Sequence, residues 1–136
     1  MVLVLKEIEE VLETLWEEAG KARSRAYVPY SGFAVGAALY TASGQIFTGC
    51  NVENGSYGLT QCAERVALGV LTSQGGDQAV ALAVQGPPGR SCSPCGACRQ
   101  VLLEHNPKLR VWFWWEGRRV ERSIPELLPE AFLLED

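Results

Sequence analysis

The sequence predicts an α/β fold, a three-layer α/β/α sandwich around a mixed five-stranded sheet. Three observations favour this class: an amphipathic segment near the N-terminus, apolar runs that turn residues divide into strand-sized pieces, and short helical segments that each follow a strand. The expected order is helix, two strands, helix, strand, helix, two strands, helix. With 136 residues and 47% hydrophobic content, we expect a single domain over residues 1–136.

The first part of the chain is expected to form one helix and one hairpin. Apolar residues recur at steps of three and one over residues 5–22, with glutamates between them, which is typical of an amphipathic helix. Residues 33–40 then predict a strand, and residues 45–52 its antiparallel partner across the Ser43-Gly44 turn.

The remaining elements alternate between helix and strand. A helix is predicted over residues 62–71 with Thr60 as its cap, and a second over about residues 95–104 with Ser93 as its cap and Pro94 at its first position. Between them, residues 79–84 predict a strand that is buried on both faces. Residues 110–115 and 118–122 predict a hairpin, and residues 124–128 a last short helix.

Composition excludes several classes of partner. The chain has 12 basic and 16 acidic residues, whereas a nucleic-acid backbone requires a basic surface, so we expect no nucleic-acid partner. Charged residues from Lys6 onward cut the N-terminal apolar run far short of a signal peptide or membrane span. We therefore expect a cytoplasmic protein with no membrane partner. Five cysteines in such a chain favour metal ligation or packing over disulfides.

Three cysteines form the candidate metal site. Cys95 and Cys98 lie three residues apart at the start of a predicted helix, so their thiols face the same way and can chelate one ion. Cys62 begins the other middle helix. Right-handed crossovers bring the N-termini of these two helices to one edge of the sheet, where Cys62 can supply a third thiol. Three protein ligands leave the fourth tetrahedral position of zinc for water.

Glu64 favours catalysis over simpler interpretations of these cysteines. Packing alone would explain Cys62, and a redox pair would explain a lone Cys-x-x-Cys. However, Cys62-Ala63-Glu64 followed by Pro94-Cys95-Gly96-Ala97-Cys98 matches the signature of zinc nucleobase deaminases, with cysteine in place of their histidine. In that signature the glutamate carries protons and is not a ligand. A structural zinc module remains the alternative from a different class, with a fourth donor from His105, Cys50 or Cys92.

Three thiolates around Zn²⁺ leave a net negative charge that a nearby positive group must offset. The two helix N-termini supply part of this positive charge. Arg65 and Arg99, each adjacent to a motif residue, are candidates to hydrogen-bond a thiolate, and Arg65 is favoured. An exposed or structural ion pair is the alternative for either arginine.

Five ordered motifs span most of the chain: YSGFAVGAAL (30–39), CNVEN (50–54), CAER (62–65), PCGACRQ (94–100) and ELLP (126–129). In these motifs the chain closely resembles the small homotetrameric class of zinc-dependent cytidine deaminases, within the cytidine and deoxycytidylate deaminase family. The resemblance implies a cytidine deaminase-like fold, one zinc ion per chain, and a homotetramer with shared active sites. Cys50 and Cys92 are not family ligands, and we interpret both as packing residues.

The resemblance also implies which residues bind the substrate. Asn51 and Glu53 would bind ribose hydroxyls, and their chemistry agrees, because side chains two apart on an extended segment point to one side. Phe33 would pack on the pyrimidine, and Phe132 would reach a neighbouring subunit's site. The resemblance further implies that Tyr57 closes the pocket, and Ala63 completes the implied set. Without the family, a solvated strand end would explain Asn51 and Glu53, and core packing would explain Phe33.

The implied reaction is hydrolytic deamination of free cytidine and 2'-deoxycytidine to uridine and 2'-deoxyuridine with release of ammonia, as in pyrimidine salvage. Zinc-bound hydroxide would attack C4, while Glu64 protonates ring N3 and carries a second proton to the departing amine. This shuttle requires a Glu64 pKa near neutrality. A deaminase of blasticidin S is the closest rival, but Asn51-Val52-Glu53 favours ribose. The acidic balance disfavours deamination within RNA or DNA.

Overall fold

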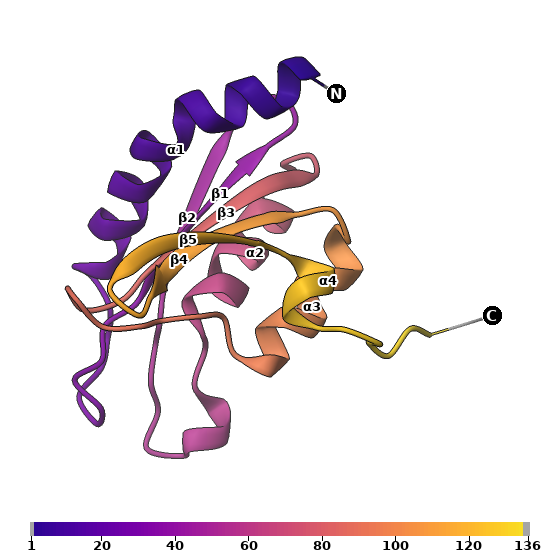
Figure 1. Ribbon diagram of the computed structural model, residues 1–136. Coiled ribbons are helices and arrows are strands. Elements are labelled where there is room, and N and C mark those ends of the chain that lie inside the picture. Colours follow the sequence, from indigo (N-terminus) through magenta and orange to yellow (C-terminus); the bar gives the residue numbers. More distant parts are fainter. Residues whose placement is uncertain (1, 135–136) are drawn as a thin grey trace.

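Five strands form one mixed sheet in the order β2-β1-β3-β4-β5, with helices on both faces (Figure 1). The computed structural model describes residues 2–134, with side chains from Glu7 onward. The strands are β1 (Gly36–Thr41), β2 (Ile46–Cys50), β3 (Ala79–Gln85), β4 (Arg110–Trp115) and β5 (Arg118–Ser123). The helices are α1 (Val2–Arg23), α2 (Ala63–Ser73), α3 (Gly96–His105) and α4 (Ile124–Leu127), with a short 3-10 helix at Tyr57–Leu59.

Strand direction follows from the connections. β3 and β4 pair in parallel through the crossover that contains α3, and the other neighbouring strands pair antiparallel. β2 and β3 both run opposite to β1, so the helices that follow them, α2 and α3, begin at the same edge of the sheet. The predicted mixed sheet, fold class and order of elements are confirmed.

The sheet separates two apolar clusters, because successive side chains of a strand point to opposite faces. Ala38 and Ala81 pack with α1, whose Leu15 and Ala19 are fully buried. Ala37 and other alternate positions pack with α2, α3 and α4 on the opposite face. The side chain of Leu5, where the predicted α1 pattern begins, lies outside the described side chains.

The strand predicted from Phe33 begins three residues later, at Gly36. The Val35 N–H donates to the Asn51 Oδ1 at 2.9 Å, and the Asn51 Nδ2 donates to the Phe33 carbonyl at 2.9 Å. The Asn51 N–H still donates to the Val35 carbonyl at 3.1 Å, but the Asn51 side-chain oxygen takes the place of its main-chain carbonyl as the acceptor for Val35, and that carbonyl accepts from the Tyr27 N–H instead. The strand predicted to end at Val52 ends at Cys50, because Val52 pairs with Tyr27 and Gln61 in isolated bridges.

The predicted caps of the two middle helices are wrong. Cys62 is the N-cap of α2 and Cys95 is the N-cap of α3. Thr60 instead ends the 3-10 helix, where its N–H donates to the Tyr57 carbonyl, and the Ser93 hydroxyl accepts a hydrogen bond from Arg99. Two of the candidate metal ligands are thus the residues at which these helices begin.

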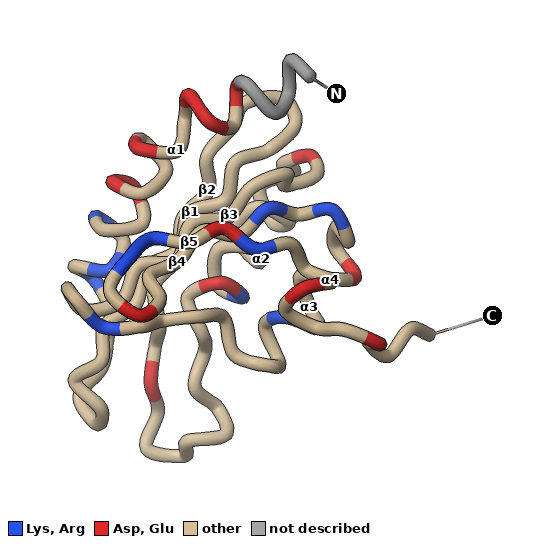
Figure 2. Tube along the Cα trace, viewed as in Figure 1, with Lys and Arg blue, Asp and Glu red and all other residues tan. Residues whose placement is uncertain are grey.

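Acidic and basic residues are interspersed along the chain (Figure 2). Acidic residues follow α1, and two of them pair with arginines of the sheet: Glu13 with Arg119, and Glu9 with Arg110 at 3.9 Å. Such exposed pairs each contribute little to stability. Within the described part of the chain, no helix is long and apolar enough to cross a membrane.

Two glycines let the helices approach the sheet closely. A Cβ at Gly36 in β1 would lie 1.9 Å from the Ala19 carbonyl of α1. A Cβ at Gly49 in β2 would lie 2.4 Å from the Ala67 backbone nitrogen and 2.7 Å from the Ala63 carbonyl of α2. Backbone atoms cannot give way as a flexible side chain does, so these positions fix the spacing between helix and sheet.

We expect Gly49→Ala to lower the free energy of unfolding by about 3 kcal/mol, because the added methyl overpacks the α2 interface. Gly69→Ala is the matched control on the exposed face of α2, where nothing lies within 4 Å of the new methyl. It should stabilise the protein by roughly 0.5–1 kcal/mol. Urea denaturation measures both; equal effects of the two substitutions would contradict close packing at Gly49.

Candidate active site

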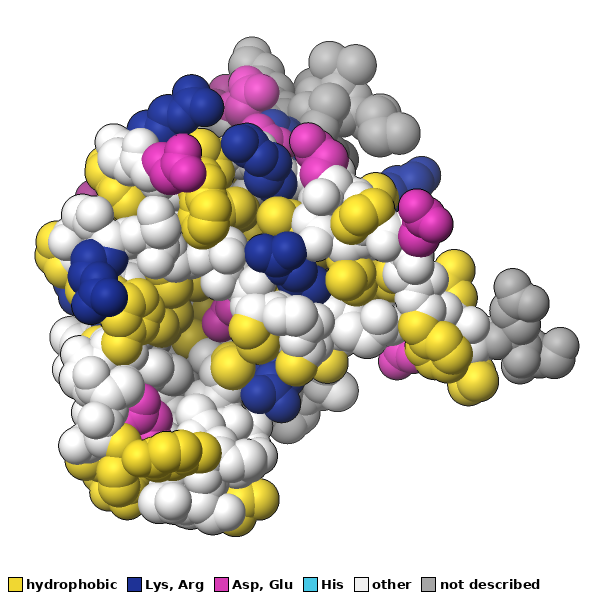
Figure 3. Space-filling model, turned by 60° about the horizontal axis from the view of Figure 1, so that its bottom comes forward, with side chains coloured by type: hydrophobic (Ala, Val, Ile, Leu, Met, Phe, Trp, Pro, Cys, Tyr) yellow, Lys and Arg dark blue, Asp and Glu magenta, His cyan; other side chains and the backbone are white. Residues whose placement is uncertain are grey.

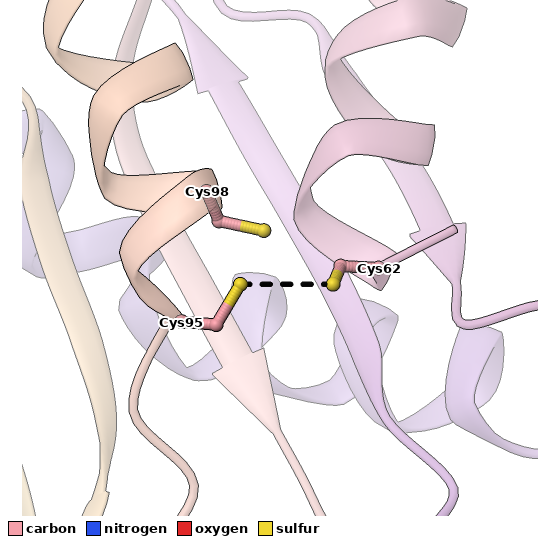
Figure 4. A group of neighbouring side chains, drawn as sticks. All are labelled: Cys62, Cys95 and Cys98. Atoms are coloured by element: carbon pink, nitrogen blue, oxygen red, sulfur yellow. Dashed lines mark hydrogen bonds between the residues drawn. The ribbon is translucent and has the colours of Figure 1, made fainter. Parts of the chain in front are cut away.

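The candidate active site lies where α2 and α3 begin. Cys62 follows the loop after β2, and Cys95 follows the loop after β3, so both reach the same edge of the sheet. Cys98 adds a third thiol from the first turn of α3 (Figure 4). The topology thus brings together the three cysteines that the sequence singled out.

The three sulfurs converge on one point (Figure 4). They lie within 4.8 Å of one another, and Cys62 Sγ and Cys95 Sγ are 3.8 Å apart. A tetrahedral zinc ion with Zn–S bonds of about 2.3 Å separates two of its sulfurs by about 3.8 Å. All three cysteines are free, and burial decreases from Cys98 through Cys62 to the exposed Cys95. The donor set therefore fits one zinc ion that is accessible from one side.

The spare donors lie outside this group. Among the described residues, the group contains the three cysteines and no further histidine, cysteine or carboxylate. The His105 Nε2 accepts a hydrogen bond from the Ala79 N–H at 2.9 Å, at the far end of α3, and burial lowers its pKa. A closed structural zinc site would require a fourth protein ligand, so this arrangement favours an open site.

Hydrogen bonds stabilise negative charge on the Cys62 sulfur. Hydrogen bonding from Cys98 lowers the pKa of the Cys62 thiol to about 5, and the pKa of Cys98 rises because its proton is held between the two sulfurs. The Arg65 Nη2 adds a donor 3.4 Å from Cys62 Sγ. The same contact raises the pKa of Arg65, so this cation stays charged beside the thiols.

Arg99 has different partners. Its Nε donates to the Pro94 carbonyl at 2.7 Å, its Nη1 to the Leu127 carbonyl at 2.7 Å, and its Nη2 to the Ser93 hydroxyl at 3.2 Å. The guanidinium therefore fastens the loop before α3 to the end of α4. Of the two candidate arginines, Arg65 is the one that contacts a cysteine sulfur.

Glu64 is buried in the first turn of α2, with 4% of its surface exposed. Burial raises the pKa of Glu64 to about 7, and the charge on Cys62 adds to this shift. A carboxyl group with this pKa both gives up and accepts a proton readily at neutral pH, as general acid-base catalysis requires. The upward shift has the direction expected from the sequence.

A hollow of about 200 Å³ opens in front of the cysteines and Glu64. Its lining includes four of the residues expected at the substrate or the proton shuttle: Phe33, Asn51, Ala63 and Glu64. Four lining residues were not predicted there, because nothing in their local pattern marks them: Val35, Thr60, Cys92 and Ser93. Burial raises the pKa of Cys92 to about 12, so its thiol remains neutral.

A second hollow, of about 270 Å³, adjoins the first at Thr60. It is lined by Tyr30, Ser31, Glu53, Tyr57 and Thr60. Figure 3 brings this end of the molecule forward and shows hydrophobic side chains over the loops and around a recess beside them. The Tyr30 and Tyr57 rings meet edge-on, 6.0 Å apart, and Tyr57 is 75% exposed.

Two of the residues predicted to bind substrate, Asn51 and Glu53, form hydrogen bonds with other residues of the protein. The Asn51 amide is bonded to the segment before β1, and the Glu53 carboxylate accepts hydrogen bonds from the N–H groups of Tyr30 and Ser31 at 3.0 and 3.1 Å. Phe132 lies in the exposed C-terminal segment and does not line either hollow.

The sequence analysis did not identify Arg90 as a residue of the site. Its guanidinium carbon lies 4.8 Å from the centroid of the Phe33 ring.

Known proteins match the chain closely. The model of the cytidine and deoxycytidylate deaminase zinc-binding region matches residues 9–113. A cytidine deaminase of Halalkalibacterium halodurans is 48% identical over 126 residues, 91% of this chain and 96% of that protein. The crystal structure of cytidine deaminase from Mycobacterium tuberculosis superposes with a TM-score of 0.81 at 48% identity, over 90% of this chain and 98% of that one. A blasticidin-S deaminase of Bacillus cereus is 34% identical over 103 residues, 70% of this chain and 74% of that protein.

The combination of a three-thiol zinc site, a buried glutamate beside it and this sheet defines a zinc-dependent hydrolytic deaminase. The family model covers well over half of the chain, and close relatives match it almost end to end. The chain therefore belongs to the cytidine and deoxycytidylate deaminase family.

We expect the purified protein to contain one zinc ion per chain and Cys98→Ala to lose it, because two thiols hold the ion far more weakly than three. Cys50→Ala is the matched control, since Cys50 lies in β2 outside the thiol group. Metal analysis by mass spectrometry after dialysis measures the zinc-to-protein ratio. Undiminished zinc in Cys98→Ala would rule out this coordination.

Proposed function

We propose that this protein deaminates free cytidine and 2'-deoxycytidine to uridine and 2'-deoxyuridine with release of ammonia, a step of pyrimidine salvage. The observation that carries the proposal is the buried Glu64 carboxyl beside three converging thiols, at a hollow with a phenylalanine ring in its wall. The identity of 48% to a cytidine deaminase, against 34% to a blasticidin-S deaminase, supports the nucleoside as substrate.

The first hollow suits a flat, polar ring. Phe33 and Val35 supply apolar wall against which a pyrimidine can stack, and Ala63 leaves room beside Glu64. Zinc held by the three thiolates supplies Lewis acidity that makes water nucleophilic at neutral pH. The Arg65 guanidinium offsets the negative charge of the thiolates.

Glu64 moves the protons. As a neutral acid it donates its proton to ring N3, which withdraws electrons from C4 and opens that carbon to attack by water. As a carboxylate it then takes a proton from the attacking water and delivers it to the exocyclic amine, which leaves as ammonia when the C4–N bond breaks. The carboxylate takes back the remaining hydroxyl proton, which leaves the C4 carbonyl of uridine and restores the neutral acid. A pKa near 7 lets one group serve in both states.

The second hollow, together with the Asn51 amide in the wall of the adjoining first hollow, suits the sugar. Asn51 uses one of its two N–H groups on Phe33, and Glu53 uses three of about four acceptor positions on Tyr30 and Ser31. One Asn51 donor remains, together with acceptor positions on Glu53 and on the Asn51 Oδ1, which is enough to hold one hydroxyl group. We assign it to the 3'-hydroxyl, which cytidine and 2'-deoxycytidine share.

We further infer a homotetramer with shared active sites. In support, Phe132, Leu133 and Leu134 are 70%, 65% and 84% exposed, and Tyr57 and Leu59 are exposed on the loop beside the second hollow. In such an assembly Phe132 would complete a neighbouring subunit's site. Five free cysteines suit the reducing cytoplasm as the location, and the mixed surface charge suits a free nucleoside rather than a nucleic acid.

The proposed substrate is tested by an ultraviolet absorbance assay over a panel of nucleosides. Cytidine and 2'-deoxycytidine should show kcat/KM values within about tenfold of each other, whereas 3'-deoxycytidine should lose at least about tenfold because its hydroxyl contact is missing. A strong zinc chelator should abolish turnover. Deamination of blasticidin S without deamination of cytidine would contradict the proposal.

Replacement of Glu64 by glutamine tests the proton carrier. The amide keeps the size of the side chain but cannot carry protons, so kcat should fall by more than about 100-fold while the zinc content stays unchanged. Glu104→Gln on the exposed face of α3 is the control and should leave kcat unchanged. Turnover of Glu64→Gln within about tenfold of the natural protein would exclude this role.

A further inference from the structure

Ser31 has an unusual set of hydrogen bonds for an exposed turn residue. Its hydroxyl donates to the Glu53 Oε2 and accepts from the Phe33 N–H at 2.9 Å. Its own N–H donates to the Glu53 Oε1 at 3.1 Å, beside the Tyr30 N–H at 3.0 Å. One serine therefore joins the carboxylate assigned to the sugar with the segment that carries the ring assigned to the base.

The hydroxyl has a role that the backbone cannot supply. The two N–H groups fix one oxygen of Glu53, but the other oxygen is held by the Ser31 O–H. Because a hydroxyl has one proton, the bond accepted from Phe33 leaves that proton free to point at Glu53. With both oxygens held, the carboxylate plane is set and one lone pair stays available for a ligand. The same hydrogen bond is the main reason why the pKa of Glu53 lies below its usual range.

We propose that Ser31 is a positioning residue for nucleoside binding, which orients Glu53 toward the sugar hydroxyl and ties it to the Phe33 segment. This role rests on the proposed function. Ser31 touches neither the reacting carbon nor the metal ligands in this arrangement, so it acts on binding rather than on proton transfer. Its place in the second hollow, with Glu53, Tyr30 and Tyr57, agrees with this assignment.

A second serine in the chain provides a matched control. The Ser43 hydroxyl donates to the Asp77 Oδ1 at 2.8 Å and lies in the hairpin turn at the opposite end of β1 and β2. Both serines are exposed, and both bond a carboxylate far away in the sequence. Ser43→Ala therefore removes the same kind of bond without touching either hollow.

The test is the steady-state kinetics of cytidine deamination by the full-length, zinc-loaded protein. Ser31→Ala should raise KM about tenfold and leave kcat within about threefold, because a mobile carboxylate binds the sugar more weakly. Ser31→Thr keeps the hydroxyl and should restore KM to within about twofold, whereas Ser31→Val, of the same shape, should not. Ser43→Ala should change neither constant. Thermal unfolding should show comparable stability for Ser31→Ala and Ser43→Ala.

The substrate 3'-deoxycytidine separates orientation of Glu53 from a general loosening of the loop. It lacks the hydroxyl assigned to Glu53, so Ser31→Ala should raise its KM by less than about threefold. An unchanged KM for cytidine in Ser31→Ala, or an equal rise for both substrates, would overturn the role of Ser31 alone. Failure of the natural protein to deaminate cytidine would overturn the proposed function and this role with it.

Discussion

The spacing between α2 and the sheet is the constraint on which the site depends. Gly49 lets the backbone of α2 lie directly on β2, and Cys62 begins that helix, so the depth of the helix sets the position of the sulfur. Cys95 is placed in the same way by α3 after β3. A tetrahedral zinc ion requires sulfurs about 3.8 Å apart, so the position of this helix bears directly on metal binding. The geometry of the metal site therefore depends on how α2 and α3 pack against the sheet.

Burial of the Glu64 carboxyl group lowers the stability of the folded protein when that group is ionised. Glu64 is buried beside thiols that favour negative charge, and its pKa in the folded chain is about 7, above the ordinary 4.5. The folded chain therefore binds more protons than the unfolded chain between these values, so this group lowers stability progressively as pH rises from about 4.5 to 7. The positive charge of Arg65, which contacts the Cys62 sulfur, partly counteracts the rise in the Glu64 pKa. Arg65 is not among the residues that line the first hollow. The buried position that gives Glu64 a pKa suited to proton transfer is therefore also a position that destabilises its charged form.

Periodicity and spacing predicted the order of elements, the mixed sheet and the three thiols, because these depend on local pattern and on right-handed crossovers. They could not predict where β1 begins, since the Asn51 amide pairs with Phe33 and Val35, 18 and 16 residues away. The helix caps were misplaced because serine and threonine are usual caps, whereas here cysteines occupy those positions for the metal. Nothing in the local sequence around Ser31 and Cys92 indicates that these residues line the two hollows. Motif resemblance supplied the substrate residues that spacing alone left open.

Arg99 has a mechanical consequence for the whole C-terminal region. Its three hydrogen bonds join the carbonyl of Pro94, immediately before Cys95, to the carbonyl of Leu127 at the end of α4. The segment that carries Phe132 is thus clamped to the loop that carries a metal ligand, and Gln100 adds a second tie by donating to the Phe132 carbonyl at 2.9 Å. A displacement of the C-terminal segment would therefore have to break these side-chain hydrogen bonds or move the loop before Cys95 with it.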